Sequence, residues 1–156
     1  MKSVDEVQVV CVPPKMLGEL WPHIGPLLLQ GQLEIHGHLG RAMAALSNHL
    51  LEAQDGRAQV WTVIDHGAHE CLAALITEIV EEDGKRVVWV SGMAGADILK
   101  WGGVTSDRMA EFARAEGCDC VRCAGRKALQ RAYRDVRCIG AHESAEDVFI
   151  FERAAQ

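Results

Sequence analysis

The chain has no long hydrophobic run and no leader-like start. Its apolar stretch Ile24–Leu29 is far too short to span a bilayer and is interrupted by Pro26. The first residues place Lys2, Asp5 and Glu6 around a short apolar run, which lacks the charge order and length of a signal peptide. We therefore expect a soluble protein in a reducing cytoplasm, with no membrane partner.

Positive charge is scarce as well. Sixteen Lys and Arg against 22 Asp and Glu give a formal net charge of −6. A nucleic-acid binder needs a positive field to recruit phosphates, so the composition argues against a nucleic-acid partner. Residues 108–137 are the exception, because eight basic residues there outnumber four acidic ones. A solvated helix face and a site for an anionic ligand or acidic partner both explain this local excess.

Internal repeats, low-complexity tracts and long linkers are also missing, which predicts one domain over residues 1–156. A domain of this size buries roughly 68–70% of its unfolded surface, so it needs neither disulfides nor a metal for stability. In a reducing compartment, the six cysteines are expected to stay as thiols.

The N-terminal third predicts a strand followed by helical segments. Val7–Val12 alternates weakly and is expected to be the first strand. Pro22 and Pro26 each remove a backbone donor, so we expect two short helical pieces bent near Trp21. The glycines within residues 31–40 favour a linker.

The next stretch predicts an amphipathic helix and a central hairpin. The helix begins near Leu39 and ends before Asp55-Gly56. Cys71–Val80 is apolar on both faces apart from Thr77 and Glu78, which is typical of a buried strand, and Asp83-Gly84 favours a tight turn. Arg86–Met93 should then pair with that strand in antiparallel fashion.

A further helix is expected to begin at Thr105, whose hydroxyl can cap it, and to end at Gly117 in a left-handed turn. The other expected elements are a strand at Ala58–Ile64, a strand at Cys118–Cys123, a helix at Gly125–Arg134 and two last strands at Val136–Ile139 and Val148–Phe151.

This order of elements resembles the GNAT acyltransferase superfamily across nearly the whole chain. The resemblance implies an α+β fold, with a mixed, mostly antiparallel central sheet flanked by helices on both faces. Several short segments look like small GNAT-like proteins encoded by tailed bacteriophages: Val12-Pro13-Pro14 leading to Trp21-Pro22, Ile76-Thr77-Glu78-Ile79, and Ala113–Cys118 before Gly125-Arg126.

The resemblance also implies a site for acyl-CoA between the fourth and fifth strands, with its pyrophosphate on the amides that open the following helix. The family's motif has Arg or Gln, then Gly three residues on, then Gly or Ala two residues later. Lys100, Gly103 and Thr105 occupy these positions, with Gly102 and Val104 completing a degenerate pyrophosphate loop. The β-branched Thr105 departs from the motif, so a glycine turn before a capped helix is the alternative.

The catalytic groups implied by the resemblance are a Glu that deprotonates the amine and a Tyr that protonates the departing thiolate. Glu78 is the acidic residue within the central hairpin strands, and Tyr133 is the only tyrosine. Tyr133 lies one residue beyond the family's spacing from Ala128, and such a shift turns a helical side chain by about 100°.

Cysteine and histidine spacing raises the question of a metal. Cys120 and Cys123 form a CxxC with Cys118 nearby, but the motif falls in an expected strand, where Cys118 and Cys120 share one face and Cys123 takes the other. We therefore expect buried thiols and no metal, although whether this thiol cluster binds one stays open.

Two functions are compatible with the sequence. The imperfect catalytic elements favour a phage-encoded, non-catalytic binding or structural protein that requires no cofactor. It would associate with a phage structural protein or with itself, in the host cytoplasm and in the virion. The alternative is an acetyl-CoA-dependent N-acyltransferase that acts on an amine of a small molecule or protein.

Overall fold

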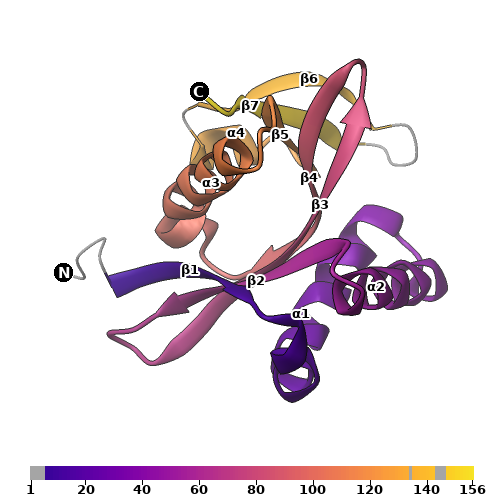
Figure 1. Cartoon of the computed structure of the whole chain (residues 1–156), viewed down its shortest axis with the longest axis vertical. Coiled ribbons are helices and arrows are strands. Elements are labelled where there is room, and N and C mark those ends of the chain that lie inside the picture. Colours follow the sequence, from indigo (N-terminus) through magenta and orange to yellow (C-terminus); the bar gives the residue numbers. More distant parts are fainter. Residues whose placement is uncertain (1–5, 134, 143–146) are drawn as a thin grey trace.

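The computed structural model describes residues 6–133, 135–142 and 147–156. Within these ranges the chain forms a seven-stranded sheet of order β1-β2-β3-β4-β5-β7-β6, in which only β4 and β5 run parallel. Helices flank this sheet on both sides, which confirms the predicted fold class (Figure 1). The elements in chain order are β1 (Val7–Val12), the 3-10 turn η2 (Pro14–Met16), α1 (Leu17–His36), α2 (Leu39–Gln54), β2 (Ala58–Asp65), β3 (Glu70–Glu82), β4 (Lys85–Gly95), α3 (Ile98–Ala115), β5 (Cys120–Gly125), α4 (Leu129–Ala132), β6 (Arg137–Ala141) and β7 (Phe149–Ala154).

Strand β3 is covered on both of its faces. Leu75 packs with Trp61 and Trp101 on the α3 side of the sheet. The next residue, Ile76, packs on the opposite side with Leu28 of α1. Alternation along one strand therefore serves two separate cores.

The central hairpin forms as the sequence predicts. Asp83 and Gly84 have φ of 55° and 74°, the positive values that a tight two-residue turn requires. The pairing of β3 with β4 shifts farther along: Thr77 pairs with Val90 and Ile76 with Gly92, so Ser91 between them is a bulge residue.

Helix α1 corrects the prediction of two short pieces bent near Trp21, because a single helix runs from Leu17 to His36 through Pro22 and Pro26. Both prolines are exposed, so the carbonyls that they leave unbonded face solvent and water can satisfy them. Burial of the opposite face against the sheet then outweighs the proline penalty.

The predicted linker at residues 31–40 is also wrong, since α1 continues to His36 and α2 begins at Leu39. Gly31 serves close packing rather than flexibility: a Cβ there would lie 2.6 Å from the backbone oxygen of Met93. The turn between the helices needs only Gly37, which has a φ of 66°.

Helix α3 begins at Ile98 and not at Thr105, so Thr105 is a buried residue within the helix and caps nothing. The buried Trp101 anchors the first turn, where its Nε1 donates to the backbone oxygen of Ala96 at 2.7 Å. The helix ends as predicted, with Gly117 at a φ of 70°.

The C-terminal elements differ in extent from the prediction. Strand β5 starts at Cys120, so Cys118 precedes it, and the expected helix at Gly125–Arg134 is reduced to α4, Leu129–Ala132, because β5 continues through Gly125. Arg134 lies outside the described residues. In the described part of the chain, no helix has the length and apolar character needed to cross a membrane.

Candidate functional site: the cleft between β4 and β5

The two parallel strands stay together for only four residues. Val87–Val90 of β4 pairs with Cys120–Cys123 of β5. Beyond this point β4 pairs with β3 alone, while Ala124 and Gly125 of β5 pair with β7. The strands therefore part in the middle of the sheet, and a cleft of about 440 Å³ opens between them.

Five segments line this cleft: the end of β4, the second half of α1, the start of α3, the chain from β5 into α4, and Val148 just before β7. Most lining side chains are apolar or small. Glu34 of α1 and Arg126 after β5 are the charged exceptions among the described lining residues. Both are exposed, and neither has a hydrogen bond or ion pair to another described residue. A carboxylate and a guanidinium from two different lining segments are therefore available to a ligand.

The prediction of a pyrophosphate loop is wrong about the backbone conformation, because the segment is helical. Its residues all lie inside α3: Lys100, Gly102, Gly103, Val104 and Thr105. Lys100 does not line the cleft, and its Nζ lies 3.2 Å from Oδ2 of the fully buried Asp65. The ammonium therefore compensates a buried carboxylate, which would otherwise be strongly destabilising. Binding of pyrophosphate by the segment's backbone stays a prediction.

The structure brings Thr105, Gly102 and Tyr133 together between α3 and the end of α4. Thr105 and Tyr133 line a small cavity of about 40 Å³, and a Cβ on Gly102 would lie 3.2 Å from the Tyr133 ring. The Tyr133 hydroxyl lies 3.7 Å from Sδ of Met93, which lines both this cavity and the cleft. Burial raises the pKa of Tyr133, so the hydroxyl keeps its proton.

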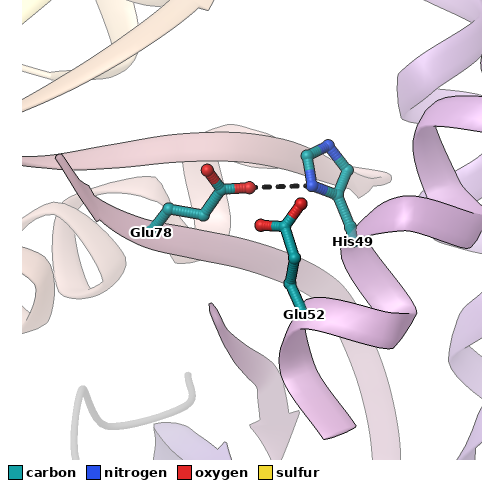
Figure 2. A group of neighbouring side chains, drawn as sticks. All are labelled: His49, Glu52 and Glu78. Carbon is teal, nitrogen blue, oxygen red and sulfur yellow. Dashed lines mark ion pairs between the residues drawn. The ribbon is translucent and has the colours of Figure 1, made fainter. Parts of the chain in front are cut away.

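Glu78 lies outside the cleft lining, in a polar cluster with His49 and Glu52 (Figure 2). His49 Nδ1 and Glu78 Oε1 are 2.9 Å apart, and about one fifth of each side chain is exposed. The nearby imidazole lowers the pKa of Glu78. Burial, followed by the neighbouring Glu78, raises the pKa of Glu52.

Gln32 is a buried polar residue of α1 that contacts the bulge in β4. Its amide Nε2 donates to the backbone oxygen of the bulge residue Ser91 at 2.8 Å, and a Cβ on Gly92 would lie 2.7 Å from the same nitrogen. Gln32 Oε1 is 3.2 Å from His36 Nε2. Burial is the main cause that lowers the pKa of His36.

The thiols do not gather into one group. Cys118 and Cys123 pack in the core on the α3 side, together with Val121, whereas the Cys120 thiol points to Glu152 Oε2 at 3.6 Å. The expectation that Cys118 and Cys120 share a face is therefore wrong, because Cys118 precedes the strand. Burial raises the pKa of Cys123 to about 12.

Comparison with solved structures identifies the fold. A variant of spermidine N-acetyltransferase from Vibrio cholerae aligns with a TM-score of 0.63 at 8% identity, covering 97% of this chain and 95% of that one. An acetyltransferase from Salmonella typhimurium that modifies the N-terminal serine of a ribosomal subunit protein aligns with a TM-score of 0.59 at 13% identity, covering 97% and 96%. A Bacillus subtilis acetyltransferase in complex with CoA aligns with a TM-score of 0.59 at 12% identity, covering 95% and 98%.

The chain therefore has the fold of the GNAT acetyltransferases. No protein-family model matches the sequence, and no curated protein matches it. These three structural likenesses give no support to a phage origin or to a place in a virion.

Sequence patterns alone do not reveal two of the residues that line the cleft. Glu34 falls in the segment whose glycines favour a linker, where no helical face is expected. The sequence draws attention to Arg126 only through the Gly125-Arg126 pair, which is one of the segments that resemble small GNAT-like proteins. A helical interpretation of residues 17–36 would place Glu34 and Gly31 on one face, three residues apart.

Proposed function

We propose that the cleft between β4 and β5 binds an acyl-CoA and that the protein transfers the acyl group to an amine. The parting of the two strands carries this proposal, because it opens the cleft inside the sheet and places Glu34 and Arg126 on its walls. The GNAT neighbours support the choice of ligand, since one of them was solved in complex with CoA.

The residues that favour a non-catalytic protein lie outside the cleft. Lys100 and Glu78 do not line it, so their departures from the family pattern do not describe its chemistry. Tyr133 does not line the cleft either, although its hydroxyl contacts Sδ of Met93, which does. The open cleft thus favours the acyltransferase over a purely structural role.

Two features suit the phosphates of the ligand. Arg126 supplies a guanidinium with no described partner, and such a group makes strong charge-assisted hydrogen bonds to phosphate. Ile98, the first residue of the 18-residue α3, also lines the cleft, so the amide end of the helix dipole opens beside it.

One side chain suits the proton transfer from the amine. The attacking amine forms a bond to the thioester carbon and loses a proton, which Glu34 accepts directly or through water. The carbon–sulfur bond then breaks, and the thiolate takes a proton from solvent in the open cleft. Tyr133 does not line the cleft, and burial raises its pKa, which makes it a weaker acid. The negative charge of Glu34 also favours an acceptor that is a cationic amine.

Calorimetric titration with acetyl-CoA tests binding. We expect micromolar affinity, about 8 kcal/mol at 1 μM. Arg126→Ala should weaken binding about tenfold, or about 1.4 kcal/mol. Arg86→Ala is the matched control, because it removes the same charge from an exposed residue at the hairpin end of β4. No heat at high micromolar acetyl-CoA would leave only the non-catalytic interpretation.

Transfer is tested by mass spectrometry of amines incubated with acetyl-CoA and protein, starting with polyamines. Glu34→Gln should keep acetyl-CoA affinity but lower the transfer rate about 10²-fold or more. Glu19→Gln, an exposed change on the same helix, should leave both unchanged. Equal rates in the two variants would remove Glu34 from the chemistry.

A further inference from the structure

Three potential metal ligands converge away from the cleft. His49 and Glu52 are three residues apart on α2, so they project from the same face of the helix, and Glu78 points toward them from β3 (Figure 2). One donor atom from each residue lies within 4.8 Å of the other two. Among the described residues, these three form the group of His, Cys, Asp or Glu side chains close enough together to hold a metal ion.

The cluster is only partly satisfied by its own members. His49 and Glu78 form an ion pair, with Nδ1 and Oε1 2.9 Å apart, but these two buried atoms are not aligned for a hydrogen bond. Such atoms are normally paired in native proteins. The cluster also sets two carboxylates against one imidazole, so it has an excess of negative charge that a cation would compensate.

The donor set matches a particular class of ion. Imidazole nitrogen and carboxylate oxygen both bind Zn²⁺ at about 2.0–2.2 Å. Atoms as close as Nδ1 and Oε1 can therefore contact one ion, and small side-chain rotations would bring the Glu52 carboxylate to it. We propose that His49, Glu52 and Glu78 form a binding site for a divalent transition-metal ion of the zinc type.

This site would join α2 to the sheet. Its ligands come from one helix and one strand, and none of the three residues lines the cleft. A bound ion therefore links α2 to β3 without lining the acyl-CoA cleft. An ion that binds only the folded protein stabilises it, and three protein ligands leave a coordination position open for water.

The test titrates ZnCl₂ into chelator-treated, dialysed protein, with calorimetry and thermal unfolding as readouts. We expect one ion per chain, a higher melting temperature, and weaker binding at lower pH because the imidazole must be neutral to ligate. Glu52→Gln should weaken binding at least tenfold. Glu111→Gln, an exposed change on α3, is the matched control and should bind as the unaltered protein does.

The six cysteines require a second arm, because thiolates also bind zinc. Co²⁺ should give visible absorption without thiolate charge-transfer bands, and the Cys120→Ser, Cys123→Ser double variant should bind Zn²⁺ unchanged. Three results would each overturn the proposal: no zinc binding, binding lost in the cysteine variant, or equal affinity in Glu52→Gln and Glu111→Gln. Melting curves of the metal-free variants establish that each is folded.

Discussion

Two charged clusters in this protein differ in balance and burial. Arg122 and Glu152 are each only 5% exposed, and their Nε and Oε2 atoms lie 2.9 Å apart. Arg122 also reaches Glu82 at 2.6 Å and Asp83 at 3.4 Å, and Arg137 reaches Glu152 at 2.8 Å, so each buried charge has more than one partner. The cluster of His49, Glu52 and Glu78 has one imidazole for two carboxylates and is partly exposed.

The difference shows in the carboxylate pKa values. Arg137, followed by Arg122, lowers the pKa of Glu152 to about 2. In the other cluster His49 lowers the pKa of Glu78, while burial and Glu78 raise that of Glu52. A saturated, buried network holds strands together, whereas an unsaturated, accessible one has capacity left for a ligand.

The largest expected effect comes from breaking the saturated cluster. Glu152→Gln keeps the shape of the side chain but leaves the buried Arg122 guanidinium without its main counter-charge. We expect a loss of about 3 kcal/mol in the free energy of unfolding, measured by urea denaturation. Glu111→Gln should change it by less than about 0.5 kcal/mol. A loss below about 1 kcal/mol in Glu152→Gln would mean that the two clusters do not differ as described.

The pH dependence of the free energy of unfolding distinguishes the contribution of the Arg122–Glu152 cluster. Because the folded pKa of Glu152 lies below its unfolded value, its contribution is fully present above the unfolded pKa of about 4.5 and is lost as pH falls toward about 2. The free energy of unfolding should therefore decline across this window, and the decline should be shallower in Glu152→Gln. Parallel pH profiles for the two proteins would contradict the pKa assignment.

The smallest expected effect lies in the unsaturated cluster. In metal-free protein, Glu52→Gln removes a carboxylate that burial and Glu78 both disfavour as an anion. Its free energy of unfolding should stay level or rise by a few tenths of a kcal/mol, because the group is partly exposed. Urea denaturation in the presence of a chelator measures this. A loss of more than about 1 kcal/mol would show that Glu52 is already satisfied without an ion.

The strands were predictable from the sequence because their signals are local. Asp83-Gly84 specifies the central turn, and the apolar run before it specifies a buried strand, so the hairpin formed as expected. The α+β layout followed from the order of such segments. Helix α2 was found in the same way, from its apolar stripe and the turn at Asp55-Gly56.

The two longest helices were not predicted correctly because tertiary packing overrides their local signals. Pro22 and Pro26 indicate breaks, yet both lie on the solvent side of a helix whose other face is buried. Gly102 and Gly103 indicate a loop, yet both lie inside α3. At Gly102 a Cβ would crowd the Tyr133 ring, whereas a Cβ on Gly103 would meet no atom within 4 Å. These errors displaced the predicted site, because Glu34 and Lys100 lie in the misassigned segments.

The cleft has a consequence for how the sheet meets other chains. Between Ser91 and Gly95, β4 pairs with β3 on one side only, so the side toward β5 is an edge inside the sheet. Outer edges such as β6 can add a strand from any neighbouring protein, which is a route to aggregation. This inner edge is walled by α1 and by the chain leading into α4. It is therefore screened from edge-to-edge pairing with a second sheet. Apart from the Ser91 carbonyl, which accepts from Gln32, its amide and carbonyl groups stay available to a slender, amide-bearing molecule.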